Sequence, residues 1–245
     1  MKIALVTGAS GGIGSCITKT FLKDGYFVIG QYNAGEDRMN ALKKQVQEMG
    51  FADYFFAIKA DLSKTEEIEK LYQNLSKSFK HIDALILCAG ADLYKLAIDT
   101  EDSEWEYLFN VNVKSAFSIT KRFLPCMMQK NYGKIIFISS IWGQNGACME
   151  SVYSSTKFAL IGYAKSLAKE VGGNNITVNC VCPGFVDTPM NARFTKEERQ
   201  EILDSTPINR ACTTKEVADL VSFLASEKAD FITGQAITID GGFTL

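Results

Sequence analysis

Histidine is nearly absent from the sequence, and His81 is the only one in 245 residues. Structural and catalytic zinc sites draw on histidine and cysteine, and a serine hydrolase triad depends on a histidine as its base. We therefore expect no metal site and no Ser-His-Asp triad. The chemistry has to come from other side chains.

Paired cysteines and long apolar runs are also missing. The seven cysteines include no C-x-x-C pair, and the apolar stretch at the N-terminus is too short for a secretory signal before Gly8 interrupts it. We expect free thiols in a reducing, cytoplasmic environment. No segment approaches the roughly 18 apolar residues of a membrane span, so the sequence predicts no membrane partner.

Charge of one sign is not in large excess. Lys and Arg number 26, Asp and Glu number 28, and the formal net charge is -2. No run of like charge is long enough to form a tail or a membrane-surface helix. Because a nucleic-acid binder normally carries a basic surplus, we expect no nucleic-acid partner.

The sequence does contain a regular alternation of short apolar runs and longer amphipathic stretches, which predict strands and helices. This alternation indicates βαβ units and a mostly parallel sheet, and nearly continuous apolar strands suit a sheet covered on both faces. We predict one α/β domain over residues 1–245, a doubly wound parallel sheet of about seven strands with helices on both faces. The predicted strands are Ile3–Val6, Tyr26–Tyr32, Phe55–Ile58, Ala84–Cys88, Lys134–Ser139, Ile176–Cys182 and Ala236–Ile239, and the predicted helices include Arg38–Met49, Thr65–Phe79, Asp102–Lys130, Val152–Val171 and Lys215–Ala225.

A glycine-rich turn, Thr7–Gly14, follows the first predicted strand directly. Glycines let the backbone approach a ligand closely, and the start of the next helix offers free N–H groups to a phosphate. The common G-x-G-x-x-G spacing is not met, because Ile17 occupies its third position. Four glycines in seven residues cost chain entropy, so a phosphate site explains the turn better than a bare loop does.

The turn matches T-G-x-x-x-G-x-G, and here the sequence resembles the short-chain dehydrogenase/reductase family. The resemblance spans the whole chain and implies a Rossmann-type fold. The landmarks that carry it, in order, are Thr7–Gly14, Asp61-Leu62, Cys88-Ala89-Gly90 (usually Asn-Ala-Gly), Asn112, Ser140, Tyr153, Lys157, Pro183-Gly184, Thr188 and Asp240-Gly241-Gly242.

The resemblance implies a catalytic tetrad of Asn112, Ser140, Tyr153 and Lys157. Tyr153 and Lys157 are four residues apart, which places them on one helix face. In the tetrad Tyr153 is the general acid or base, Ser140 binds the substrate oxygen, and Asn112 holds a water that relays protons. We expect the Lys157 ammonium to lower the pKa of Tyr153. Isolated, Ser140 could merely cap a strand and Asn112 could merely bend a helix.

The same resemblance implies a nicotinamide cofactor, bound by Gly8, Ser10, Gly11, Gly12, Ile13, Gly14, Asn33, Asp61, Leu62, Cys88, Ala89, Gly90, Tyr153, Lys157, Pro183, Gly184, Val186 and Thr188. An NAD enzyme carries an acid at the end of the second strand, where Gln31 falls here. This favours NADP(H) over NAD(H). Gly11 argues the other way, since many NADP enzymes of the family have a cation there, and the nearest cation is Arg38.

The substrate is expected to be a ketone or alcohol. The broad resemblance is to 3-oxoacyl-acyl-carrier-protein reductases, although Asn131 and Asn174 replace the arginines that dock the acidic carrier, with Lys130 and Lys134 near. A narrower resemblance, over Ser139–Ser154, is to elongation factor P 5-aminopentanone reductases, whose ketone carries an amine and is linked to a protein. Glu150 could bind that amine, or could be a solvated loop carboxylate.

Further alternatives stay open. A hydroxysteroid or sugar-alcohol dehydrogenase would favour oxidation, and a nucleotide-sensing regulator would be expected to have lost part of the tetrad. Residues 188–212 are predicted to form a lid over the substrate. The predicted substrate contacts are Trp142, Glu150, Met190 and Phe194. Apolar faces on the helices that hold Asn112 and Tyr153, together with the resemblance, predict a homotetramer or homodimer.

Overall fold

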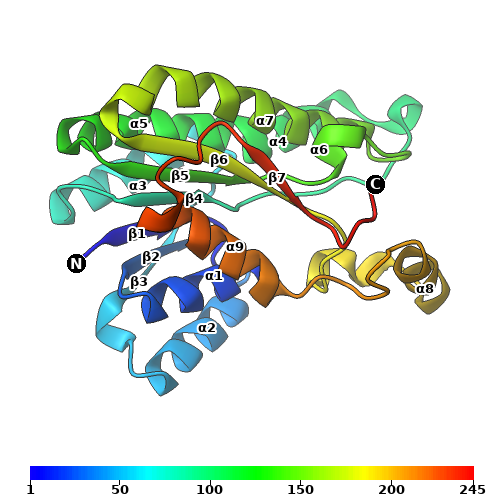
Figure 1. Cartoon of the computed structure of the whole chain (residues 1–245), viewed down its shortest axis with the longest axis horizontal. Helices are drawn as coiled ribbons and strands as arrows, with labels where there is room; N and C mark the ends of the chain where they lie inside the picture. The colour runs from blue at the N-terminus through cyan, green and yellow to red at the C-terminus, as the bar shows by residue number, and fades with distance from the viewer.

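Seven parallel strands form one sheet at the centre of the computed structural model, which describes residues 1–245 (Figure 1). Their order in the sheet is β3-β2-β1-β4-β5-β6-β7. The strands are β1 Ile3–Val6, β2 Phe27–Tyr32, β3 Phe55–Lys59, β4 Ala84–Leu87, β5 Gly133–Ile138, β6 Ile176–Pro183 and β7 Ala236–Ile239. The predicted fold class is confirmed.

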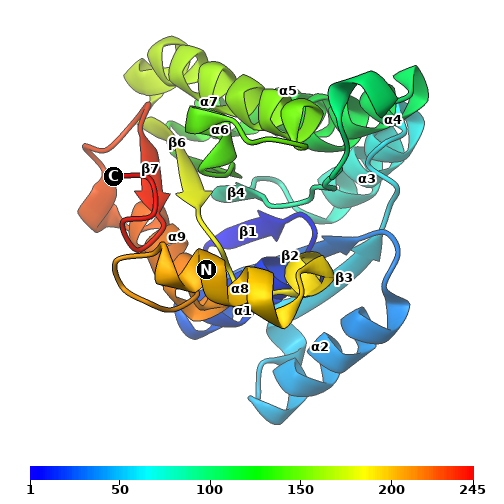
Figure 2. The same ribbon diagram turned by 90° about the vertical axis from the view of Figure 1, so that its right-hand side faces the viewer.

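Helices cover both faces of this sheet, as Figures 1 and 2 show. Helices α1, α2 and α9 pack on one face, and α3, α5 and α7 pack on the other. The bounds are α1 Gly12–Lys23, α2 Glu36–Glu48, α3 Thr65–Ser78, α4 Asp102–Phe109, α5 Ser115–Lys130, α6 Trp142–Asn145, α7 Ser151–Val171, α8 Lys196–Asp204 and α9 Thr214–Ala225.

The nearly continuous apolar strands supply two cores at once. In β1, Leu5 packs with α3, α5 and α7, whereas Ala4 and Val6 pack with α1, α2 and α9. Successive side chains of a strand point to opposite faces, so a sheet covered on both faces needs apolar residues at every position. The cores therefore fix the sheet between two helix layers.

The strand order reverses between β1 and β4. From β1 the chain builds outward through β2 to β3, then crosses back and builds outward through β4, β5 and β6 to β7. In open parallel sheets the loops at such a reversal diverge and leave a crevice beyond the carboxyl ends of the strands. This is where the fold places a ligand site.

The helix predicted over Asp102–Lys130 is not continuous. Helix α4 ends at Phe109, a π-helical turn occupies Asn110–Lys114, and α5 begins at Ser115. A π turn adds one residue to the helical repeat and is frequent at functional sites. Here it turns the Asn112 side chain toward the loop after β4.

The sequence predicts free thiols and no membrane-spanning segment. All seven cysteines are free thiols. No helix combines the length and the apolar character that a membrane crossing requires.

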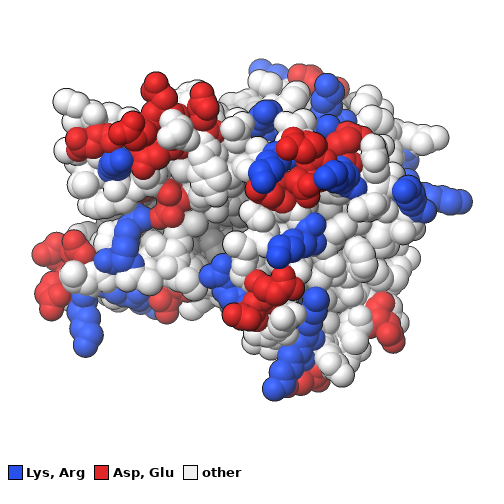
Figure 3. Space-filling model, turned by 180° about the vertical axis from the view of Figure 1, so that it is seen from behind, with Lys and Arg blue, Asp and Glu red and all other residues white.

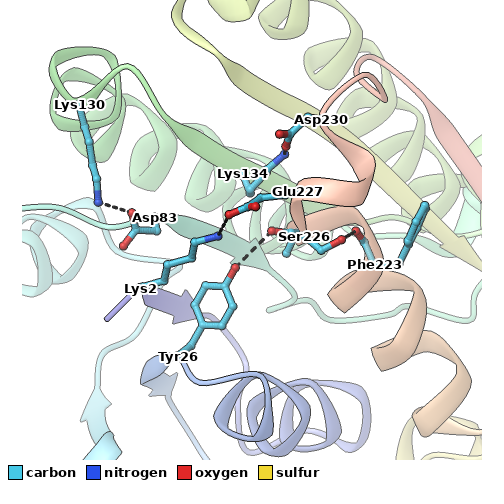
Figure 4. Close-up of polar contacts among 10 residues, drawn as sticks. Lys2, Tyr26, Asp83, Lys130, Lys134, Phe223, Ser226, Glu227 and Asp230 are labelled. Carbon is cyan, nitrogen blue, oxygen red and sulfur yellow. Dashed lines mark hydrogen bonds and ion pairs between the residues drawn. The ribbon is translucent and has the colours of Figure 1, made fainter.

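Ion pairs lie at the amino ends of the strands, on the side of the sheet away from the crevice (Figure 4). Lys134 on β5 is only 1% exposed, and its Nζ lies 2.5 Å from Oδ1 of Asp230, which comes before β7. Asp83 is equally buried and pairs with Lys130 at 2.5 Å. Each pair thus compensates one buried charge with a partner nearer the surface.

Asp230→Asn should destabilise the fold, because it leaves the buried Lys134 ammonium without its counter-charge. We expect the free energy of unfolding to fall by about 2 kcal/mol, below the 3–5 kcal/mol typical of fully buried pairs because Asp230 is itself exposed. Glu227→Gln is the matched control, since its pair with Lys2 is exposed and should contribute less than about 1 kcal/mol. Urea unfolding of both variants measures the difference, and equal losses would contradict it.

Candidate active site

A cavity of about 800 Å³ lies at the carboxyl ends of the strands, where the strand order reverses. The segments that follow β1 to β6 form its walls, and residues 188–212 add a further wall. Figure 3 shows the molecule hollowed on the face opposite to that of Figure 1. Every residue predicted to contact cofactor or substrate lines the cavity, and so does Ser140.

The glycine turn is built by close backbone contacts. Gly8 has φ +66°, and a Cβ there would lie 2.9 Å from Cα of Ala89. A Cβ on Gly14 would collide with the Gly8 carbonyl oxygen. Helix α1 starts at Gly12 with no side-chain cap and no acid in its first turn. Its first N–H groups are therefore available to an anion, which fits the diphosphate of a dinucleotide.

Lys157 lies one turn after Tyr153 on α7 and is only 6% exposed. Its Nζ donates a hydrogen bond of 3.0 Å to the carbonyl oxygen of Ile138, at the end of β5. The same Nζ is 5.4 Å from the centroid of the Tyr153 ring. Burial lowers the pKa of Lys157 to about 8, so the amine is still largely protonated at neutral pH.

The pKa of Tyr153 differs from the sequence-based expectation. Burial raises this pKa above its usual value, the nearby Glu150 carboxylate raises it further, and a hydrogen bond from Ser140 opposes them. We expected Lys157 to lower it, but desolvation of the phenolate is the largest contribution, and Lys157 is not among the groups that shift this pKa. The expectation was wrong for this structure, in which Tyr153 is a protonated phenol at neutral pH.

Asn112 is buried and does not line the cavity. Its amide accepts a hydrogen bond of 2.8 Å from the Ala91 N–H, and donates to the Ala91 carbonyl at 2.9 Å and to Thr156 Oγ1 at 3.0 Å. It lies beside Lys157, because a Cβ on Gly90 would be 3.3 Å from Asn112 Oδ1 and 3.5 Å from Lys157 Nζ. Asn112 thus ties the loop after β4 to α7.

Gln31 lies near the end of β2, where the sequence analysis placed it, and lines the cavity. Its side chain is 1% exposed, accepts a hydrogen bond of 3.0 Å from the Gly8 N–H and donates one of 2.8 Å to the Ala60 carbonyl. It thus joins three neighbouring strand ends, and both its amide oxygen and its amide nitrogen are engaged in these bonds. The residues beyond it that line the cavity are Asn33, Ala34 and Arg38, none of them acidic.

Arg38 lies closer to the site than its distance in sequence suggested. Gly35, with φ +103°, turns the chain sharply, and a Cβ on Gly35 would lie 2.7 Å from Nη2 of Arg38. The guanidinium therefore folds back over the turn and lines the cavity. It makes no side-chain hydrogen bond or ion pair, whereas the other four arginines all do. A cation of this kind suits a phosphate.

Glu150 is buried, at 6% exposed, rather than solvated. It comes directly before α7 and three residues before Tyr153, and its Oε1 lies 3.0 Å from Nη2 of Arg193. Burial raises the pKa of its carboxyl group, and the guanidinium opposes that shift. Arg193 also pairs with Asp92 on the loop after β4. The predicted contacts Trp142, Met190 and Phe194 line the same cavity.

Sequence reasoning missed Asp92, Tyr94 and Arg193, which meet at one end of the cavity. Asp92 and Arg193 are 101 positions apart, so no local pattern joins them. A cation inside the predicted lid segment was the one available signal, but the sequence does not give its partners.

Known proteins resemble this chain along nearly its full length. A family model described as Enoyl-(Acyl carrier protein) reductase matches residues 8–244. Uncharacterized oxidoreductase YmfI of Bacillus subtilis is 38% identical over 242 residues, which cover 99% of this chain and 98% of the relative. The 3-oxoacyl-[acyl-carrier-protein] reductase FabG of Thermotoga maritima is 32% identical over 245 residues, covering 100% and 98%.

A second reductase of the same name, from Salmonella typhimurium, is 36% identical over 245 residues, which cover 98% of this chain and 96% of the relative. These matches agree with the parallel sheet, the glycine turn at its reversal point, and the Ser140, Tyr153 and Lys157 side chains that meet beside it. The chain belongs to the short-chain dehydrogenase/reductase family and is an NAD(P)-dependent oxidoreductase.

Proposed function

We propose that the protein reduces a ketone to an alcohol with NADPH. The observation that carries the proposal is a single cavity with an anion-binding turn and a free Arg38 guanidinium in one part, and Ser140, Tyr153 and Lys157 in another. The glycine contacts and uncapped start of α1 fit a dinucleotide, as described above. The nicotinamide supplies the hydride when bound; the protein has to orient the carbonyl and provide a proton.

Tyr153 is the proton donor in this proposal. Its pKa is raised by burial and by the Glu150 carboxylate, so the phenol keeps its proton at neutral pH. A protonated acid supports reduction, in which the carbonyl oxygen gains a proton, better than oxidation, which needs a base. Ser140 would orient the substrate oxygen, and the Lys157 ammonium would stabilise the phenolate that remains after transfer.

Preference for NADPH rests on the end of β2. No acid there repels a 2′-phosphate, and Arg38 has a free guanidinium over the Gly35 turn. An arginine near this position accommodates the 2′-phosphate in dinucleotide-binding folds. We infer that Arg38 takes that role here.

The first substrate class we propose is a 3-oxoacyl group on a carrier protein, because relatives at 32% and 36% identity are named for it. The surface that would dock an acidic carrier has less positive charge here than the resemblance implies. Asn131 and Asn174 carry no charge, and Lys130 and Lys134 are both engaged in ion pairs at the edge opposite the cavity (Figure 4).

An amino ketone, as in elongation factor P 5-aminopentanone reductases, is the second candidate. The buried Glu150 carboxylate favours it, because Glu150 and Asp92 both line the cavity and outnumber the single Arg193 guanidinium between them. An ammonium group on the substrate would find compensating charge there.

We also propose self-association through α5 and α7. Phe123 and Leu167 face the core, but Phe117 and Phe158 are 46% and 45% exposed, on the outer faces of these helices. These two exposed aromatic side chains are of the kind found at an interface with a second copy.

Tyr153→Phe should lower kcat for ketone reduction by about 10²- to 10⁴-fold, because no other group can give the proton at that point. Binding of NADPH, followed by its fluorescence, should stay close to wild type. Tyr163→Phe removes a hydroxyl from the same helix outside the cavity and should keep the wild-type rate. Full activity in the Tyr153 variant would exclude it as the acid.

Arg38→Ala should raise KM for NADPH about 10- to 100-fold and leave KM for NADH unchanged, because a hydrogen bond to a charged group contributes about 1.5–3 kcal/mol. Lys44→Ala, which removes the same charge from an exposed position on α2, is the control and should change neither constant. Steady-state kinetics with both cofactors measure this. An equal rise for NADH and NADPH would rule out a role in selecting the 2′-phosphate.

Glu150→Gln should distinguish the two substrate classes. If the substrate carries an amine, kcat/KM for an amino ketone should fall about tenfold more than for a neutral ketone of the same length, because only the amine loses a charged partner. Pairs of such ketones assayed with NADPH give the ratio. Equal losses for the two ketones would remove the amino-ketone candidate.

A further inference from the structure

Residues 188–212, the segment that forms one wall of the cavity, have almost no core packing of their own. The turn Pro189–Arg193 and helix α8 contain no buried residue, although Met190, Phe194 and Ile202 line the cavity. Segments with few buried apolar contacts open at a small cost in free energy. The polar contacts of this segment therefore decide how much of the time it stays closed.

One guanidinium makes the densest of these contacts. Arg193 Nη2 lies 3.0 Å from Glu150 Oε1, and Nη1 bonds Asp92 on the loop after β4. The carbon of the guanidinium is 4.8 Å from the ring centroid of Tyr94 and 4.9 Å from that of Phe194. Two carboxylates and two aromatic faces from three parts of the chain thus surround one cation.

Both carboxylates are attached to fixed parts of the site. Ala91, next to Asp92, has its N–H and its carbonyl bonded to the Asn112 amide. Glu150 directly precedes α7, and the carbonyl of Met149 beside it accepts a 2.6 Å hydrogen bond from the backbone of the loop after β4. Arg193 and its neighbour Phe194 are the members of the cluster that belong to residues 188–212, and Arg193 is the one that bonds the carboxylates.

We propose that Arg193 is a positioning residue that clasps residues 188–212 over the cavity, through its ion pairs with Asp92 and Glu150, and that this closure sets the affinity for the ketone. A buried carboxylate that loses its partner is left with an uncompensated charge, so Glu150 favours the closed segment. The planar fork of arginine reaches both acids at once, which an ammonium cannot do in the same geometry. Only the effect on ketone affinity rests on the proposed function.

Arg199 offers a matched comparison in the same segment. It also stacks on an aromatic ring, with 5.2 Å to the centroid of Phe185, and it pairs with Asp187 at 3.1 Å. Asp187 is 69% exposed and lies beside the segment rather than across the cavity. Exposed pairs contribute little, so Arg199→Gln should leave closure unchanged.

The direct test is limited proteolysis of the NADPH-saturated protein with thermolysin, which cuts at apolar residues and so does not depend on the arginines that are replaced. Arg193→Gln should speed cleavage within residues 188–212 about tenfold, since the closed state loses its main contact. Asp92→Asn with Glu150→Gln should do the same from the opposite side. Arg199→Gln should cleave at the wild-type rate.

Kinetics with a neutral ketone separate closure from simple electrostatics. Arg193→Gln should raise KM for the ketone about tenfold, with a smaller change in kcat, because the chemistry still proceeds once the segment closes. Arg193→Lys keeps the charge near Tyr153 but loses the fork, so its cleavage and its KM should both stay above wild type.

Two failures remain distinguishable. If no ketone is reduced by the wild-type protein, the proposed function fails, while the cleavage rates still report on the clasp. If ketones are reduced but Arg193→Gln and the double variant are cleaved no faster than Arg199→Gln, the clasp is overturned. Full rescue of both readouts by Arg193→Lys would also overturn it, in favour of an effect of charge alone.

Discussion

The candidate site depends on keeping one amine charged where little water reaches it. Lys157 is 6% exposed, and its Nζ is anchored by the Ile138 carbonyl at 3.0 Å. Burial of an ammonium is costly unless nearby groups compensate it, and here the cost appears as a pKa lowered to about 8. The amine still carries its charge at neutral pH. This charge lies at the ends of β4 and β5, beside Gly90 and the Ile138 carbonyl.

In sequence, Tyr153 lies between that amine and a carboxylate, with Glu150 three residues before it, just ahead of α7, and Lys157 four residues after it. Burial and, after it, the Glu150 carboxylate raise the pKa of the phenol, so it holds its proton at neutral pH. In the proposed reduction, the Lys157 ammonium would favour the phenolate once the proton has left.

Much of the fold and of the site could be predicted from local pattern. Apolar runs identified the strands, and the spacing from Thr7 to Gly14 identified the glycine turn at the start of α1, because both depend on neighbours in sequence. The π turn at Asn112 could not be predicted, since it is stabilised by bonds to Ala91 and Thr156, which are 21 and 44 positions away. The hydrogen bonds of Gln31 could not be predicted for a similar reason: its partners are at two other strand ends.

The remaining differences come from backbone turns and from charge. Arg38 was judged distant because the sharp turn at Gly35 was not anticipated, and the pKa of Tyr153 was predicted in the wrong direction because burial cannot be counted from sequence. The sequence analysis had named both Arg38 and Tyr153. What it could not give was the effect of three-dimensional packing on each of them. The sequence therefore indicated which groups take part more reliably than how their surroundings tune them.

The most direct measurement of the central claim, that the protein reduces a ketone with NADPH, follows the transfer of the hydride. NADPH carrying deuterium at the transferring position of its nicotinamide would be incubated with the protein and a ketone, and the alcohol analysed by mass spectrometry. The account predicts one deuterium on the former carbonyl carbon, in a C–D bond that does not exchange with solvent. Alcohol that forms without deuterium, or no alcohol from any 3-oxoacyl, amino or simple ketone, would contradict it.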